Sequence, residues 1–388
     1  MTSLEPLPLP NGLREETVDC SQSCGLVWHT IVAGQRGKPL ILFCHGFPEL
    51  AFSWRKVLPQ VADAGFFCVA MDQRGYGRTT GWPKREFHDV ALADYTYTNL
   101  VRDLVCLVYG LGYTEAFGIV GHDFGGVSSA MAAVIRPDVF RSTVQLSHPH
   151  HPPPRPQIAG EPAKEKVDIQ AELAKLDPPQ KHYKYYNSTA EAASHWDNPS
   201  QGLERFLRGY FHLKSADWPV NAPQPLERWA AEDLAPMPEY YIMQKQHSMP
   251  EAILHNMEGE DYAKTERWLS PGDLQVYCRE WRRTGFQGAL NWYRSQTGSA
   301  MELAKDMLLF AGRRIEVPCI FISGKQDWGN YQQPGALESY EDPQTVKPGC
   351  FRGVRLIDHA GHWVQQEQPE AVVKELLSFF GTLKATPV

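Results

Sequence analysis

Runs of apolar residues alternate with helix-like patterns along the first 147 residues of the chain. The segment at 26–32 alternates apolar and polar positions like a half-buried strand, whereas the later runs are nearly continuous and typical of strands buried on both faces. These later strands are predicted at 40–44, 66–71 and 142–146, with helices at 54–64 and 99–109. Such alternation predicts a mostly parallel, doubly wound α/β sheet that binds ligands at the carboxyl ends of its strands.

The pattern changes after Leu146. A proline- and histidine-rich stretch at 147–156 cannot form regular structure, and it opens a long region with helical patterns and little strand signal. Helices are predicted there at 165–176, 202–212, 239–247 and 273–283. Strand patterns return at 317–324 and 354–357. We therefore expect a core made of residues 1–147 and 315–388, and an inserted helical cap, or lid, at 148–314.

Length and composition agree with a large globular protein. The 388 residues are 43% hydrophobic and 21% charged, enough for one α/β core and a sizeable insertion. The net charge of -7 disfavours a nucleic-acid partner. The N-terminus lacks a signal-peptide pattern and no apolar stretch approaches a spanning length, so we expect a cytoplasmic location without membrane insertion. Cys44, Cys68 and Cys319 lie in apolar runs and are expected to be core thiols.

The sequence Gly121-His122-Asp123-Phe124-Gly125 marks the most informative point of the chain. It follows an apolar run that begins at Phe117 and precedes a run of small residues, as in a strand, a sharp turn and a helix. This pattern is a nucleophile elbow, in which flanking glycines let the strand and helix approach closely and leave the central side chain exposed.

Asp123 occupies the central position of the elbow, where hydrolases of acyl groups have serine. A carboxylate can attack a saturated carbon that bears a leaving group, and it then forms an alkyl ester on the enzyme that water must break. The alternative is an aspartate that merely caps the following helix.

A histidine and a second acid follow in the order expected of a catalytic triad. Asp327 comes after the strand at 317–324, and His362 comes after the strand at 354–357. Neutral His362 can take a proton from water, while Asp327 holds the imidazole in one tautomer and stabilises its positive charge. His359 and Asp358 are the competing histidine and acid. Asp358 is too near His362 in sequence to lie naturally against the ring nitrogen that faces away from the nucleophile.

The loop after the strand at 40–44 completes the set of candidate catalytic groups. The backbone N–H of Phe47, with that of Phe124, can face the negative oxygen that develops on the Asp123 ester carbonyl. The histidines at 148, 150 and 151 have no carboxylate or cysteine at ligand spacing, so we expect a hinge between domains and no metal site.

These motifs resemble those of the epoxide hydrolases of the α/β-hydrolase fold, with matches from about residue 25 to 380. They are His-Gly-Phe-Pro-Glu at 45–49, Ser-Trp-Arg at 53–55, Met-Asp-Gln-Arg-Gly-Tyr-Gly at 71–77, and Gly-His-Asp-Phe-Gly-Gly at 121–126. Haloalkane and fluoroacetate dehalogenases share the core motifs, so the cap must distinguish the reactions. The resemblance implies an α/β-hydrolase fold with an inserted helical cap. Substrate contacts are expected at His45, Pro48, Trp54, Trp292 and Trp363.

The cap supplies the tyrosines that the resemblance implies. Asn291-Trp292-Tyr293-Arg294 is similar to the family's Asn-Trp-Tyr-Arg segment, whose tyrosine points at the substrate. A second family tyrosine matches Tyr183 by position, with Tyr185 and Tyr186 as alternatives. Two hydroxyls suit the reaction, because ring opening leaves an alkoxide that they can stabilise and finally protonate.

The resemblance thus implies an enzyme that converts an epoxide and water to a vicinal diol, with no metal or organic cofactor. A dehalogenase or another hydrolase with the same Asp-His-Asp triad is the first alternative, and a non-catalytic small-molecule binding protein is the second. Phe124 disfavours dehalogenation, because haloalkane dehalogenases usually have there a tryptophan whose indole N–H holds the halide. The expected partner is a small apolar epoxide, without nucleic acid, and both a monomer and a homodimer are compatible with the sequence.

Overall fold

An eight-stranded sheet forms the centre of the protein in the computed structural model, which describes residues 4–83, 86–162, 167–297 and 305–384. The strand order is β1-β2-β4-β3-β5-β6-β9-β10. The bounds are β1 Leu13–Cys20, β2 Leu26–Ala33, β3 Leu40–Cys44, β4 Phe67–Met71, β5 Gly118–His122, β6 Thr143–Leu146, β9 Cys319–Gly324 and β10 Phe351–Ile357. β1 and β2 pair antiparallel at one edge, β2 meets β4 antiparallel, and all later pairs are parallel. The predicted α/β sheet is confirmed.

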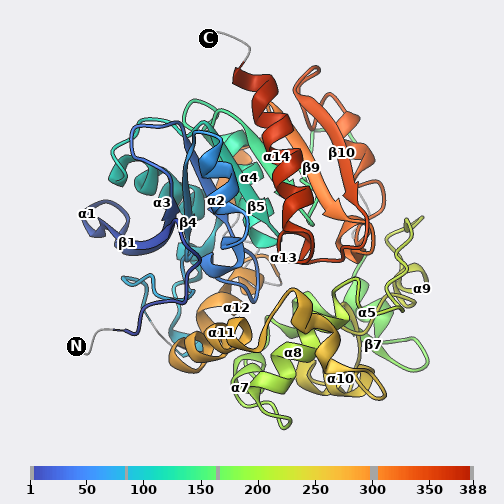
Figure 1. Cartoon of the computed structure of the whole chain (residues 1–388). Helices are drawn as coiled ribbons and strands as arrows, with labels where there is room; N and C mark the ends of the chain where they lie inside the picture. The colour runs from blue at the N-terminus through green and yellow to red at the C-terminus, as the bar shows by residue number, and fades with distance from the viewer. Residues whose placement is uncertain (1–3, 84–85, 163–166, 298–304, 385–388) are drawn as a thin grey trace.

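Helices cover both faces of this sheet (Figure 1). One layer contains α3 (Tyr97–Gly110) and α4 (Phe124–Ile135), with the short α1 (Ser21–Cys24) beside β1, and the other contains α2 (Leu58–Asp63) and α14 (Pro369–Lys384). Alternate residues of β3 pack against the two helical layers. Leu40 and Leu42 pack with the α3 and α4 side chains, whereas Ile41 and Phe43 pack with those of α2 and α14. The continuous apolar pattern of β3 therefore reflects burial on both faces.

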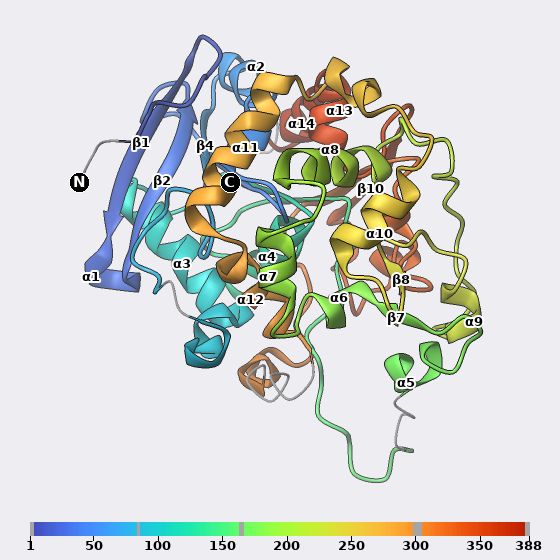
Figure 2. The ribbon, with the colours of Figure 1, turned by 90° about the horizontal axis from the view of Figure 1, so that it is seen from below.

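The cap is inserted between β6 and β9 and lies across the carboxyl ends of the strands (Figures 1 and 2). Its helices are α5 Ile169–Leu173, α6 Tyr183–Tyr186, α7 Ala192–Asp197, α8 Leu203–Leu213, α9 Ala231–Leu234, α10 Met249–Asn256, α11 Pro271–Thr284 and α12 Gln287–Arg294. The α/β-hydrolase fold with a helical cap is thus confirmed. After β10, the short α13 (Val364–Glu367) leads into α14.

Two local predictions need correction, and a third lies partly outside the described residues. The segment 239–247 is not a helix, because β8 (Ile242–Gln244) pairs antiparallel with β7 (Gln180–His182). A strand of three residues is too short to show a period, and its pairing decides its conformation. The helix predicted at 54–64 is split into a 3-10 turn, Ala51–Trp54, and α2. The helix predicted at 165–176 starts at residues outside the described ones, and α5 begins after its capping residue Asp168.

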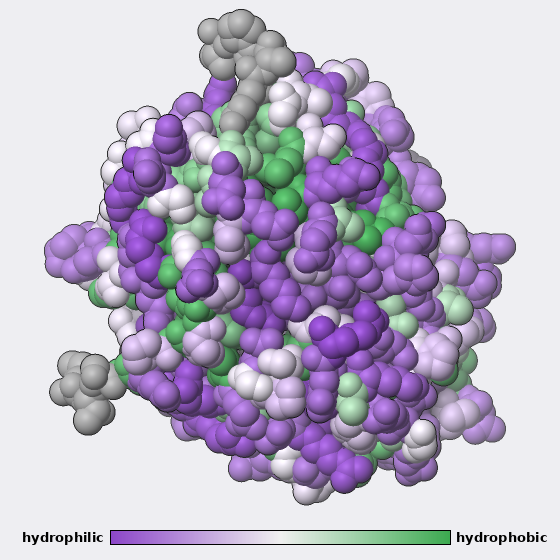
Figure 3. Space-filling model, in the orientation of Figure 1, coloured by the Kyte–Doolittle hydropathy of each residue, from purple (hydrophilic) through white to green (hydrophobic). Residues whose placement is uncertain are grey.

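The surface and interior follow the expected division of polarity. The face of Figure 1 is mostly hydrophilic, with scattered apolar side chains (Figure 3). Cys44, Cys68 and Cys319 are buried, as expected of core thiols. Among the helices that the structure describes, none is long and apolar enough to cross a bilayer.

Candidate active site

The turn between β5 and α4 presents Asp123 at the carboxyl edge of the sheet. Asp123 has φ 53° and ψ -117°, a backbone conformation that is strained for a residue with a side chain and typical of functional sites. The flanking glycines explain how the turn is built, because a Cβ on Gly121 would overlap the Gly125 carbonyl, and a Cβ on Gly125 would overlap the Cys44 carbonyl. No described backbone N–H of α4 donates to the Asp123 side chain, so it does not act as a helix cap.

The two carboxylate oxygens of Asp123 have different surroundings. Oδ1 accepts a hydrogen bond from the backbone N–H of Phe47 at 3.0 Å, and Oδ2 lies 3.5 Å from Nε2 of His362. Burial raises the pKa of Asp123, but its interaction with the adjacent His362 ring, followed by the charge of Lys214, holds the pKa well below its usual range. The carboxylate is therefore ionised and one of its oxygens is available for attack.

The loop Gly46–Phe47 lies directly against the nucleophile. A Cβ on Gly46 would overlap the Asp123 side chain, so only glycine permits this approach. Phe124 is the first residue of α4, and its N–H has no partner within the helix. Phe47 thus donates to Asp123 as predicted, and Phe124 supplies a second N–H at the adjacent helix end.

His362 lies between the two aspartates. Its Nδ1 lies 3.1 Å from Oδ2 and 3.2 Å from Oδ1 of Asp327, while Nε2 is buried without a hydrogen-bond partner among the described residues. A proton on Nδ1 satisfies Asp327 and leaves Nε2 as an acceptor that faces Asp123. The competing acid Asp358 instead pairs with Lys325 on the surface.

Asp327 follows β9 and is buried. It accepts a hydrogen bond from the N–H of Gly329 at 2.7 Å and one from the hydroxyl of Ser323 at 3.3 Å. Burial raises the pKa of its carboxyl, but the charge and hydrogen bond of His362 lower the pKa by more, so it lies below its usual range. The structure thus brings Asp123, His362 and Asp327 together as the sequence predicts.

A set of buried groups fixes the His362 loop. The carbonyl of His362 accepts a hydrogen bond from Nε2 of His122 at 2.7 Å, and Nδ1 of His122 lies 2.7 Å from the Glu49 carboxylate. Burial lowers the pKa of His122, but the charge of Glu49 raises it above its usual value. The N–H of His362 donates to the Lys214 carbonyl at 2.8 Å. Glu49 and His122 stand within the sequence motifs, but nothing local in the sequence indicated that they pair.

Two cap tyrosines converge above the nucleophile. The ring centroids of Tyr183, at the start of α6, and Tyr293, on α12, are 5.8 Å apart, and the Tyr293 ring lies 4.6 Å from that of Phe124. The Tyr183 hydroxyl donates to Oε1 of Gln332 at 3.4 Å. Burial, followed by neighbouring polar groups that include Asp123, raises the pKa of both phenols well above the usual value, so both stay protonated.

The two alternative tyrosines point elsewhere. Tyr185 is 39% exposed, and the hydroxyl of Tyr186 bonds to Nδ1 of His195 at 3.0 Å. Tyr183 is therefore the ring of this segment that meets Tyr293. Tyr210 on α8 is a further buried phenol whose pKa is raised by burial and by Asp123, and its hydroxyl has no partner among the described residues. Only the packing of the cap reveals it, because its helix shows an ordinary amphipathic pattern.

Two residues expected to contact the substrate have structural positions. His45 is fully buried, its Nδ1–H donates to the Gly46 carbonyl at 2.8 Å, and its Nε2 accepts from the N–H of Gln73 at 3.1 Å. Trp54 is fully buried and packs on Phe43 at 5.2 Å. In this structure both side chains support the Phe47 loop and the core beneath it, and their contact with a substrate stays a prediction.

The other three predicted contacts lie nearer the site. Trp292 packs on Phe124 at 5.5 Å, and Trp363 packs on His362 at 4.7 Å. The carbonyl of Pro48 accepts a hydrogen bond from the indole N–H of Trp281 in the cap at 2.9 Å. These residues form the walls around the catalytic groups and join the core loop to the cap.

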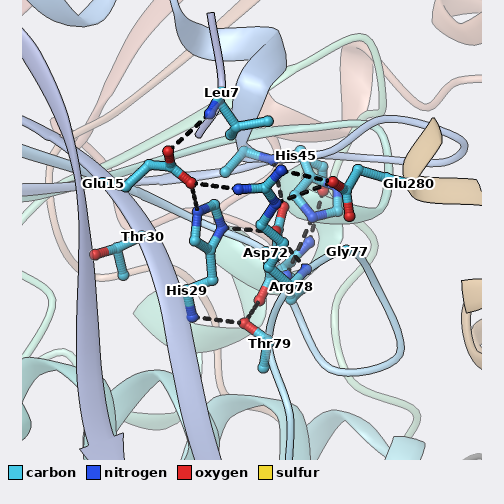
Figure 4. A network of polar contacts seen from close by, with 12 residues as sticks. Leu7, Glu15, His29, Thr30, His45, Asp72, Gly77, Arg78, Thr79 and Glu280 are labelled. Atoms are coloured by element: carbon cyan, nitrogen blue, oxygen red, sulfur yellow. Dashed lines mark hydrogen bonds and ion pairs between the residues drawn. The ribbon is translucent and has the colours of Figure 1, made fainter. Parts of the chain in front are cut away.

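Asp72 also lies at a strand end but belongs to a separate network (Figure 4). Its carboxylate contacts Nδ1 of His29 at 2.8 Å and accepts from the N–H of Arg78 at 2.8 Å. The Arg78 guanidinium bridges Glu15 of β1 and Glu280 of α11 at 2.7 and 2.9 Å. Although burial lowers the pKa of His29, the charge and hydrogen bond of Asp72 raise it to about 9. This network ties the cap to the core.

Comparisons with known proteins identify relatives of the whole chain. Residues 39–180 match the family model described as alpha/beta hydrolase fold. The chain is 32% identical to Epoxide hydrolase A of Mycobacterium tuberculosis, over 93% of this chain and 96% of that protein. It is 29% identical to an epoxide hydrolase of Caballeronia sordidicola, over 91% of each. It is also similar to the solved structure of an epoxide hydrolase from an endophytic Streptomyces, with a TM-score of 0.75, 27% identity and coverage of 97% and 98%.

Proposed function

Because the chain belongs to the epoxide hydrolases of the α/β-hydrolase fold, we propose that it opens epoxides to vicinal diols through an ester on Asp123. The observation that carries this mechanism is the convergence of an ionised carboxylate, two protonated phenols and a histidine base in one buried site. Each group supplies one of the chemical roles that epoxide hydrolysis requires.

The first half-reaction forms the ester. Oδ1 of Asp123 is held by the Phe47 N–H, so Oδ2 is the oxygen that attacks the epoxide carbon. The carbon–oxygen bond of the ring breaks, and its electron pair stays on the epoxide oxygen. Tyr183 and Tyr293 stabilise that oxygen and one of them gives it a proton. Since burial keeps both phenols protonated, they act as donors at neutral pH.

The second half-reaction breaks the ester. Nε2 of His362 takes a proton from water, and the hydroxide attacks the ester carbonyl carbon of Asp123. The developing oxyanion is on Oδ1, which already receives the Phe47 hydrogen bond, and the N–H of Phe124 can add a second one. When the tetrahedral intermediate collapses, the bond to the substrate oxygen breaks and that oxygen takes the proton from the His362 imidazolium, which releases the diol. The Asp123 carboxylic acid then returns its proton to the tyrosinate, so the carboxylate, the histidine base and both phenols are restored. Asp327 stabilises the imidazolium meanwhile.

Phe124 favours an epoxide over a halide as the substrate. A departing halide needs a hydrogen-bond donor, and the Phe124 side chain has none. An epoxide oxygen stays attached to the product, so a proton from a phenol is sufficient.

Intact-mass analysis of His362→Gln tests the mechanism. Without its base, the enzyme should retain the Asp123 ester and gain the mass of the whole epoxide, whereas Asp123→Asn should gain none. A gain equal to an alkyl halide minus HX, with no epoxide adduct, would instead indicate a dehalogenase. If no member of an epoxide panel forms an adduct and the wild-type enzyme forms no diol, the proposed mechanism is wrong.

We further propose that residues 1–147 and 315–388 form the catalytic core and that 148–314 form a cap that supplies both tyrosines. The position of the cap elements between β6 and β9 supports this division. We also propose a cytoplasmic location, which cell fractionation tests. The native mass in solution distinguishes a monomer from a homodimer.

A further inference from the structure

A cavity of about 360 Å³ is lined by residues that neighbour the proposed catalytic groups along the chain. Its lining residues follow those groups closely along the chain: Lys184 comes directly after Tyr183, and Val127 lies one helical turn beyond Asp123. Ser295, just past Tyr293, lines it as well. The volume falls within the range of small-molecule sites. The charge of Asp123 also acts on Lys184, so the cavity lies close to the nucleophile.

Lys184 gives the cavity its charge. Among the described residues that line it, Lys184 alone carries a formal charge, and the lining includes neither aspartate nor glutamate. The parts of the chain that the structure describes offer Lys184 no ion-pair partner. Burial lowers the pKa of its ammonium group, and the charge of Asp123 opposes that shift. The Lys184 side chain is partly buried, and an ammonium group that has lost part of its hydration without gaining a paired anion would be stabilised by an anionic ligand.

Neutral histidines surround Lys184. Burial, with the charge of Lys184, lowers the pKa of His182 to about 3 and that of His148 to about 4. Nδ1 of His182 accepts from the N–H of Lys184 at 3.2 Å, so its proton is on Nε2, where it can be donated. Nε2 of His150 is buried and has no partner among the described residues. The cavity thus offers a cation and unused hydrogen-bonding capacity.

The remaining walls are mostly apolar and aromatic, and include Tyr97, Met131 and Trp229. Such walls suit a hydrocarbon chain or ring between an epoxide and a polar end group. Among the described residues, no group of three or more His, Cys, Asp or Glu side chains could hold a metal ion, so a cation-bridged ligand has no built site there.

We propose that Lys184, assisted by His182, binds a carboxylate on the substrate, and that the preferred substrates are apolar epoxides with a carboxylate at the far end. This inference rests on the proposed epoxide hydrolysis and concerns its specificity. The epoxide oxygen lies under Tyr183 and Tyr293, and the carboxylate lies in the cavity beside Lys184.

Paired substrates test the inference. Para-carboxystyrene oxide and terminal epoxy-alkanoic acids of increasing chain length are each compared with their methyl esters, which differ only in charge. A hydrogen bond to a charged group is worth about 1.5–3 kcal/mol, so the acid should have a kcat/KM about 10- to 100-fold above that of its ester at the best chain length. In Lys184→Met this ratio should fall toward one, mainly through a higher KM for the acid, and Lys184→Arg should restore part of it.

Lys181→Met is the matched control. Lys181 lies on the neighbouring strand β7, where its ammonium group packs over the ring of Tyr186 at 4.8 Å, and it does not line the cavity. The control should keep the wild-type acid-to-ester ratio.

Equal kcat/KM for acid and ester at every chain length in the wild-type enzyme would overturn the inference, as would an equal loss for both substrates in Lys184→Met. Styrene oxide separates this failure from that of the mechanism. If styrene oxide is hydrolysed but carboxylates give no preference, only the specificity inference is wrong. If no epoxide is hydrolysed, the proposed function itself is wrong, and the inference fails with it.

Discussion

Replacement of Asp327 by asparagine should separate the two half-reactions. In the free enzyme, His362 faces two carboxylates, with Nδ1 3.1 Å from Asp327 and Nε2 3.5 Å from Asp123. Ester formation removes the charge of Asp123, so Asp327 is then, among the described residues, the one ionised carboxylate in contact with His362. The loss of Asp327 should therefore slow ester hydrolysis far more than ester formation.

The size of the effect follows from the geometry. With an effective dielectric constant of about 20, two unit charges at the Asp327–His362 distance attract by about 5 kcal/mol. Asparagine keeps the shape and a weaker dipole, so most of this energy is lost when the imidazolium forms. Since about 1.4 kcal/mol corresponds to a factor of ten, hydrolysis should slow by about 10³- to 10⁴-fold.

Rapid-quench intact-mass analysis measures both steps. Asp327→Asn should show ester formation close to the wild-type rate and then accumulate nearly complete ester during the first turnover. Asp358→Asn is the matched control, because Asp358 is close in sequence to His362 but pairs with Lys325 on the surface. If Asp327→Asn slows ester formation as much as hydrolysis, or if Asp358→Asn also accumulates ester, the assigned role of Asp327 is wrong.

Three further changes test other parts of the structure. Gly46→Ala should abolish ester formation in a folded protein, as judged by circular dichroism and adduct mass, because the new Cβ would lie 2.7 Å from Oδ1 of Asp123. Tyr183→Phe should slow ester formation by about 100-fold, since one proton donor is lost, while Tyr186→Phe, which loses only the bond to His195, should leave the rate unchanged in the same assay. His29→Gln should lower the free energy of unfolding by about 3 kcal/mol below about pH 6.5, because folding raises the pKa of His29 to about 9 and so stabilises its charged imidazole. The difference should disappear as the pH rises through about 9, and denaturant titration at several pH values measures it. A loss of unfolding free energy that does not change with pH would contradict this role of His29.

The sequence alone determined the parts of this protein that depend on local patterns. The buried strands, the Gly-x-Asp-x-Gly turn and the order Asp123, Asp327, His362 each rest on short segments whose conformation and chemistry are set by their own residues. The strand ends of a parallel sheet meet at one edge, so these segments also predicted that the three side chains converge.

The tertiary structure decided what depends on contacts between distant segments. The choice of Tyr183 among three neighbouring tyrosines follows from the packing of α6 against α12, and β8 forms because β7 pairs with it. His45 stands in a functional motif, yet its hydrogen bonds to the adjacent loop make it a support. The charge in the side cavity likewise depends on which groups surround Lys184 in space. Burial and partners set the role of a polar side chain, and both are properties of the folded chain.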